Sequence, residues 1–179
     1  MRAFICLAIL QAAMLAGCSI AEPTVGAFAS STVDVGIVVS DVDKAVAFYR
    51  DAIGFTEVKG FDVPAVMGGD SGLTDNRPFR VRVMVLADRR NATKVKLMQF
   101  AEAPPARQDT RFINSTLGMR YLTVYVNDMA AAVARAKQAG AAPLAKGPYL
   151  LPEGFPKDVY LTVVRDPDGN MIELVGPNR

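Results

Sequence analysis

Apolar and polar residues alternate over residues 33–39, as expected for a strand with two different faces. Ser40 and Asp41 follow as a helix-capping pair. Apolar residues then recur at helical spacing as far as Gly54, where the helix is expected to end: Val42, Ala45, Val46, Tyr49 and Ile53. This single apolar stripe predicts a helix with one side packed against a sheet.

The same pattern of strand, cap and helix recurs later in the chain. Residues 121–126 alternate, Asn127 and Asp128 follow as a cap, and a second apolar stripe ends before Gly140. Each helix is followed by further extended segments, at 56–63, 79–87 and 94–100, and then at 143–146, 159–165 and 171–175. The repetition predicts two strand-helix-three-strand modules, at about residues 32–101 and 119–176, within one domain over residues 32–179.

Composition is consistent with a folded domain and excludes several kinds of chemistry. The 179 residues are 51% hydrophobic and 21% charged, with a net charge of +2. Lysine and arginine do not cluster, so we expect no nucleic-acid partner. The chain has no histidine, which excludes a Ser-His-Asp triad. Both cysteines, Cys6 and Cys18, precede the predicted domain, so we expect neither a disulfide nor a thiolate metal site there.

The N-terminus has the features of an export signal. The apolar run over residues 3–15 is too short to span a bilayer. The Leu-Ala-Gly-Cys sequence that ends at Cys18 resembles the lipobox of bacterial lipoproteins. The resemblance implies a signal peptide over residues 1–17, a lipid on Cys18 that anchors the chain to the membrane, and a flexible tether over residues 18–31. Ser19, in place of an aspartate, favours the outer membrane, on the periplasmic side of the envelope. The alternative is an ordinary secreted protein.

Two longer motifs resemble the vicinal oxygen chelate superfamily. The first covers residues 39–55 and contains Phe48-Tyr49 before Gly54-Phe55; the second covers residues 164–175 and contains Asp-Pro-Asp-Gly and Met-Ile-Glu-Leu. The superfamily includes glyoxalase I, extradiol dioxygenases, methylmalonyl-CoA epimerase and bleomycin-binding proteins. The resemblance implies an α+β fold in which two βαβββ modules curl into a cup, with the ligand inside and the helices outside.

In the metal-dependent members, four positions on the floor of the cup carry metal ligands, usually His, Gln or Glu. By resemblance these positions are Asp34, Lys96, Tyr121 and Glu173, with Gln99 replacing Lys96 if the strand register differs. A lysine ammonium has no lone pair and repels a cation, so we expect no metal cofactor. Binding of Mg²⁺ or Ca²⁺ by the two carboxylates and Tyr121 is the alternative.

The mixed charges of this set have two interpretations. In the structural one, Lys96 neutralises Asp34 or Glu173 in the floor of the cup. In the functional one, Glu173, Tyr121 and Lys96 contact a ligand or move a proton as catalytic residues. Strand alternation predicts further polar side chains on the same inner face. With Asp34, the expected ligand-binding residues are then Lys96, Tyr121, Glu173, Thr123, Tyr125 and Arg82, and the inner face also includes Met98, Tyr160 and Thr162.

Three classes of function follow from these expectations. The favoured one is a binding module that holds a small polar or anionic molecule without a catalytic metal, as the bleomycin-binding relatives do. The second is an enzyme, a lyase or isomerase of the glyoxalase type. The third is an interaction scaffold, because two-module domains of this kind commonly form homodimers.

Overall fold

The computed structural model describes residues 29–30, 32–87, 91–100 and 102–179. Thr32–Arg179 forms one compact unit. This unit contains every helix and strand given below and both clusters of buried apolar residues, so we expect it to fold on its own. The predicted signal peptide and Cys18 lie outside the described residues. Within the described residues, no helix is long and apolar enough to cross a membrane.

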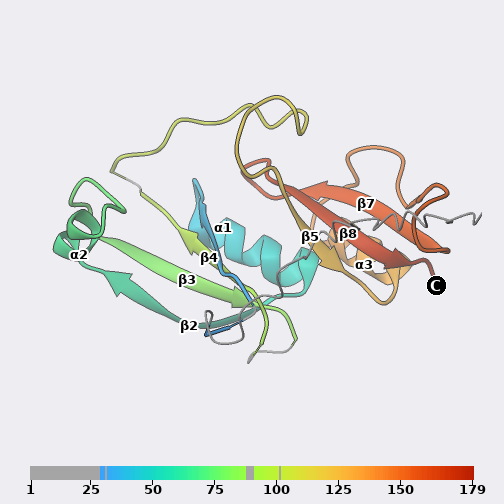
Figure 1. The fold of residues 1–179 in the computed structure, drawn as a ribbon, viewed down its shortest axis with the longest axis horizontal. Coiled ribbons are helices and arrows are strands. Elements are labelled where there is room, and N and C mark those ends of the chain that lie inside the picture. The colour runs from blue at the N-terminus through green and yellow to red at the C-terminus, as the bar shows by residue number, and fades with distance from the viewer. Residues whose placement is uncertain (1–28, 31, 88–90, 101) are drawn as a thin grey trace, which may run out of the picture. The chain divides into compact units, whose positions relative to one another are not determined.

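The first module forms a four-stranded sheet in the order β1-β4-β3-β2 (Figure 1). β1 runs parallel to β4, and the other pairs are antiparallel. The first helix continues without a break into a wider turn, in which the Gly54 amide donates to the carbonyl of Tyr49 at 3.1 Å. The elements are β1 (Val35–Val38), α1 (Val42–Ala47), η1 (Phe48–Ile53), β2 (Thr56–Val63), α2 (Ala65–Asp70), β3 (Phe79–Val85) and β4 (Lys94–Met98).

The second module repeats this topology in the order β5-β8-β7-β6, with β5 parallel to β8. Its elements are β5 (Tyr121–Tyr125), α3 (Met129–Gln138), β6 (Tyr149–Leu150), β7 (Val159–Arg165) and β8 (Met171–Pro177). The predicted α+β fold with two repeated modules is therefore confirmed. The strand expected at residues 143–146 is not formed; the short β6 lies after it instead. Pro143, at the start of the expected segment, and Pro148, just after it, have no N–H to donate and oppose regular pairing.

Both long helices begin at the predicted caps. The side chain of Asp41 accepts a hydrogen bond from the Lys44 amide, and that of Asp128 accepts one from the Ala131 amide, both at 3.0 Å. Each bond satisfies an amide that the first helical turn leaves unpaired. The same local chemistry therefore starts the helix in both modules.

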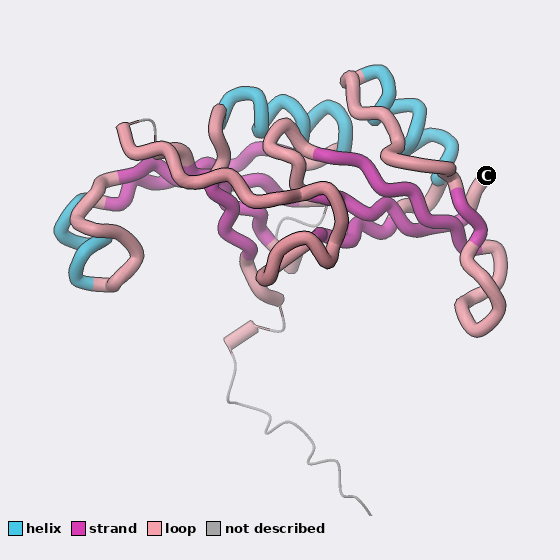
Figure 2. Tube along the Cα trace, turned by 90° about the horizontal axis from the view of Figure 1, so that it is seen from above, coloured by secondary structure: helices cyan, strands magenta, loops and turns pink. Residues whose placement is uncertain are grey.

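The main core lies between the helices and one face of each sheet. Figure 2 shows α1 with η1 and α3 on the same side of the strands. Buried side chains from both modules, among them Leu97 of β4 and Leu174 of β8, form one continuous cluster beneath these helices. The opposite face of the two sheets, which we call the open face, carries the predicted floor positions.

Candidate functional site

An ion pair lies on the open face of the first sheet. Lys96 Nζ of β4 is 2.9 Å from Asp34 Oδ2, just before β1. The amide of Lys94 donates to the other carboxylate oxygen at 3.2 Å. The hydrogen bond from Lys96 is the main reason that the pKa of Asp34 is lowered, against a smaller opposing effect of burial. Both oxygens of the Asp34 carboxylate thus already interact with donors of the protein itself.

A second polar pair lies on the open face of the second sheet. Thr123 Oγ1 of β5 donates to Glu173 Oε2 of β8 at 2.8 Å. Tyr121 and Tyr125 lie on the same face of β5 and are 49% and 81% exposed. Within the described part of the chain, no hydrogen bond or ion pair joins Lys96 to Glu173. Of the four predicted floor residues, Asp34 and Lys96 therefore pair with each other, Glu173 pairs with Thr123, and Tyr121 is in neither pair.

Strand register shows that Lys96 and Glu173 occupy equivalent places in the two sheets. Lys96 lies beside Gly36 in the parallel pair β1–β4, and Glu173 lies beside Thr123 in the parallel pair β5–β8. Gln99 is not on this ladder: its side chain donates to the Ser40 carbonyl at 3.0 Å and accepts from the Val42 amide at 3.1 Å. The register thus places Lys96, not Gln99, opposite Glu173 in the repeat.

Three residues expected on the inner face lie on the other side of the sheets. Arg82 pairs with Leu97 in register, and Thr162 pairs with Leu174, so both point toward the helices, as does Tyr160. Arg82 forms ion pairs there with Asp43 and Glu57. The expectation for Arg82, Tyr160 and Thr162 was wrong. Residues directly opposite in antiparallel strands share a face, and the predicted alternation of inner and outer positions was shifted by one residue on these strands. Met98 does lie on the open face, beside Val38.

A cavity of about 610 Å³ lies where the two modules meet. Its walls come from β1 and β5, from the residues after β4, from the turn between β7 and β8, and from residues 102–120, which we call the connecting loop. Of the predicted ligand-binding residues, only Tyr121 lines it. The lining side chains that the sequence did not single out include Val38, Arg107, Gln108, Met119, Arg120, Asp168 and Asn170.

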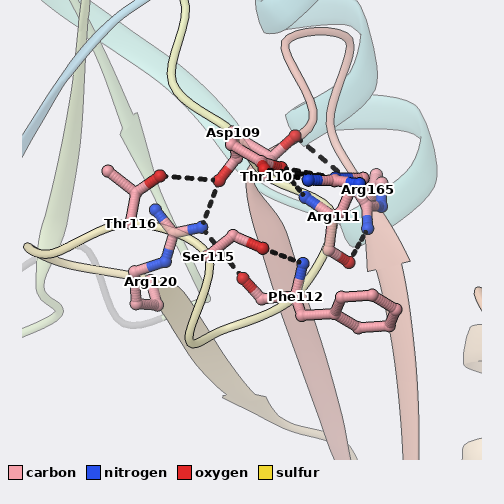
Figure 3. A network of polar contacts seen from close by, with 8 residues as sticks. All are labelled: Asp109, Thr110, Arg111, Phe112, Ser115, Thr116, Arg120 and Arg165. Carbon is pink, nitrogen blue, oxygen red and sulfur yellow. Dashed lines mark hydrogen bonds and ion pairs between the residues drawn. The ribbon is translucent and has the colours of Figure 1, made fainter.

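Two arginines hold the connecting loop in place (Figure 3). Arg120 donates to the carbonyls of Asp109, Phe112 and Ile113 and to the side chain of Gln108, at 3.0 to 3.2 Å. Arg165 of β7 donates to the Arg111 carbonyl at 2.7 Å and to the Thr110 hydroxyl at 3.2 Å. The loop next to the cavity is therefore fixed by side-chain donors, because it has no regular backbone pairing of its own.

Comparison with known proteins identifies the family. The sequence matches the Glyoxalase/Bleomycin resistance protein/Dioxygenase superfamily over residues 31–174. The chain belongs to this superfamily. No curated protein matches the chain.

Solved structures of superfamily proteins share the fold. A glyoxalase family protein from Bacillus cereus is 22% identical with a TM-score of 0.70, over 88% of this chain and 100% of that one. A glyoxalase I variant from Zea mays is 16% identical with a TM-score of 0.60, over 83% of this chain and 45% of that one. A glyoxalase family protein from Enterococcus faecalis is 19% identical with a TM-score of 0.55, over 79% and 94%. At these identities the likeness extends to the fold alone.

The residues at the superfamily's metal positions do not fit a divalent ion here. Two of the four positions, Asp34 and Lys96, form an ion pair, and the ammonium group of Lys96 would repel a cation placed beside it. Glu173 already accepts a hydrogen bond from Thr123. Across the residues that the structure describes, no group of three or more His, Cys, Asp or Glu side chains could hold a metal ion. We therefore derive no chemistry from a metal.

The cavity residues gave only a weak signal in the sequence. Arg107 and Arg120 lie in the long connection between the modules, and Asp168 lies in the Asp-Pro-Asp-Gly sequence of the second family motif. Long connections between regular elements often border binding sites. Nothing in the local sequence showed that residues 102–120 would line a cavity together with β1 and β5.

Proposed function

We propose that this superfamily domain binds a small molecule, without a catalytic metal, in the cavity between β1 and β5. The observation that carries the proposal is the cavity itself. Its volume of about 610 Å³ is within the range of roughly 300–1,000 Å³ that ligand sites occupy. Apolar side chains from both modules line it together with a few polar groups, and this combination binds and orients small organic ligands.

The polar pairs on the open face favour ligand binding in the cavity over ligand binding at the floor residues. Asp34 and Lys96 neutralise each other, and Glu173 accepts from Thr123. A ligand that contacted these groups would first have to compete with an existing partner. Tyr121 has no hydrogen-bond partner within the described residues and offers both an aromatic ring and a hydroxyl to the cavity.

A blocked cavity tests the proposal. Residues 32–179 are screened against a metabolite library by thermal shift, and ligands that raise Tm are retested on Val38→Trp, which places a large ring in the cavity. Phe61→Trp is the matched control, because Phe61 also lies on the open face of the first sheet but does not line the cavity. Stabilisation should disappear in Val38→Trp and persist in Phe61→Trp. Ligands that stabilise both variants equally would refute the proposed site.

We also propose that the mature chain is attached through a lipid on Cys18 to the periplasmic side of the envelope, at the outer membrane. The apolar leader and the Leu-Ala-Gly-Cys sequence support this. Cells fed a radiolabelled fatty acid should label the wild-type protein and not Cys18→Ser. An unlabelled wild-type protein recovered in the soluble periplasmic fraction would contradict the proposal.

A homodimer is a second proposal, favoured by apolar side chains exposed on the open face. Phe61, Tyr121 and Tyr125 all have large exposed surfaces there. Large exposed apolar patches are typical of protein interfaces. Light scattering of residues 32–179 should give a dimer mass that Tyr125→Glu converts to a monomer mass. A monomer mass for the wild type at high concentration would contradict this second proposal.

A further inference from the structure

Arg107 is a cation at the edge of the cavity with few protein partners. Its side chain is 72% exposed, and its polar contact within the described structure is an ion pair at 3.6 Å between Nη1 and Asp168 Oδ1. A guanidinium has five N–H donors, and none of those of Arg107 makes a hydrogen bond to a described residue. Arg107 therefore has donors available for a ligand at this position.

The other charged residues of the cavity are already engaged. Arg120 uses its donors on the connecting loop. Asp168 Oδ2 accepts from the Ser40 amide at 2.9 Å, at the start of the first helix. Two arginines and one aspartate line the cavity, which leaves a net charge of +1 on its walls. An anion is thus favoured over a cation, and Arg107 is the group that can meet it.

Apolar side chains line the cavity on both sides of the junction, alongside several neutral polar ones. Val38 of β1, Tyr121 of β5 and Met119 of the connecting loop line the cavity and are partly exposed. A ligand that covers them gains from removing apolar surface from water. Their position in the same cavity as Arg107 means that one molecule could cover the apolar walls and meet the cation at the same time.

We infer that the cavity takes an amphipathic small molecule with an acidic group, whose apolar part lies against β1 and β5 and whose anion meets Arg107. This inference rests on the proposed binding function and names its ligand class. Arg120 acts in it as a positioning residue. Its planar fork holds the carbonyls of the connecting loop, which carries Arg107, and a lysine cannot reproduce that geometry.

Two matched dyes distinguish the contribution of the acidic group to binding from that of the apolar part. 1-Anilinonaphthalene-8-sulfonate and N-phenyl-1-naphthylamine share the same rings, and only the first carries a sulfonate. Both are titrated into residues 32–179 by fluorescence. The sulfonate dye should bind roughly five- to tenfold more tightly, as one charge-assisted contact at a partly exposed site gives. Arg107→Gln should remove most of that preference.

Controls distinguish the site from general dye binding. Arg111→Gln removes another exposed arginine of the connecting loop, one that pairs with Asp109 and does not line the cavity, and should keep the preference. Arg120→Lys should weaken both dyes and shift the backbone NMR signals of residues 104–113. Val38→Trp should abolish binding of both dyes.

Each outcome has a definite meaning. Failure of both dyes to bind the wild type, or binding that survives Val38→Trp, overturns the proposed cavity function and this inference with it. Equal affinities for the two dyes, or an unchanged preference in Arg107→Gln, overturn the inference while the binding function stands. Unchanged affinities and unchanged loop signals in Arg120→Lys overturn the positioning role of Arg120.

Discussion

The hydroxyl of Tyr49 forms a buried link between the two modules. Tyr49 lies in η1 and is fully buried, and its hydroxyl donates to Asp166 Oδ2 at 3.3 Å. Asp166 belongs to the turn between β7 and β8 and is 4% exposed. Its carboxylate also accepts from the amides of Asp168 and Asn170 and from the side chain of Asn170. Tyr49→Phe removes one of these donors and leaves the ring in place.

The size of the effect can be worked from this geometry. A hydrogen bond to a charged group contributes about 1.5–3 kcal/mol to stability. The 3.3 Å distance exceeds the usual O–H···O range of about 2.5–3.0 Å. Three other donors still satisfy the carboxylate. We therefore expect a loss at or just below the low end, about 1–1.5 kcal/mol, which corresponds to a fall in Tm of about 2–6 °C for a domain of this size.

Urea unfolding followed by circular dichroism measures this loss on residues 32–179. Tyr160→Phe is the control, because Tyr160 is a partly buried tyrosine that packs against the same core but makes no hydrogen bond through its hydroxyl within the described residues; it should change stability by less than about 0.5 kcal/mol. A double-mutant cycle with Asp166→Asn isolates the pair. The reasoning fails if Tyr49→Phe costs no more than Tyr160→Phe, or if the two effects in the cycle simply add.

Four further predictions concern charged groups and metal ions. Burial raises the pKa of Asp166, so the protonated side chain stabilises the fold fully below about pH 4, and this stabilisation is lost as the pH rises through the raised pKa. In urea unfolding, the free energy of unfolding of Asp166→Asn relative to that of the wild type should therefore increase with pH above about 4. A constant difference would contradict this. Arg135 of α3 donates to the carbonyls of Ala52 and Ile53 at 3.2 and 2.8 Å, so Arg135→Met should lower the free energy of unfolding by about 1–3 kcal/mol, whereas the exposed Lys137→Met should change it little. Lys96→Met should raise the pKa of Asp34 toward its ordinary value, measured by NMR titration, and should cost about 1 kcal/mol or less because the pair is partly exposed. Zn²⁺, Ni²⁺ or Mn²⁺ should not raise Tm of the wild type, and a stoichiometric metal in the purified domain would refute the metal-free interpretation.

The module repeat could be predicted because its signals are local. Asp41 and Asp128 cap helices within three residues of their own position, and Gly54 and Gly140 end them with positive φ of 98° and 82°. The pattern that identifies one helix therefore identifies the other. The same repeat predicted the position of Lys96 in the sheet, and the pairing of β1 with β4 places Lys96 beside Gly36.

The faces of β3 could not be predicted, because its continuous apolar face is not the one that packs against the helices. Val81, Val83 and Val85 are buried on the open side, and Met84 is buried on the helix side. Alternation then identifies two faces without telling which is inner. A change of register between Val58 and Phe61 on the neighbouring strand adds a further offset. Arg82 was therefore assigned to the wrong side.

The cavity could not be predicted from the local sequence, for a different reason. Its charged residues are Arg107 and Arg120 in the connecting loop and Asp168 in a distant turn, and they meet only because the modules pack together. No residue spacing in the sequence indicates that these three side chains line the same cavity. The family resemblance directed attention to the floor positions, where the superfamily holds its metal.

Divergence between the two modules explains why the cavity, and not the floor, is the better candidate. Asp34 and Tyr121 hold equivalent places in the repeat, as do Lys96 and Glu173. In the first module these places form an ion pair; in the second, Glu173 instead accepts from Thr123, which replaces Gly36 at the equivalent position. Tyr121 is thereby left without a polar partner in the described structure, and it faces the cavity. Tyr121 is thus the one floor residue that lines a ligand-sized cavity.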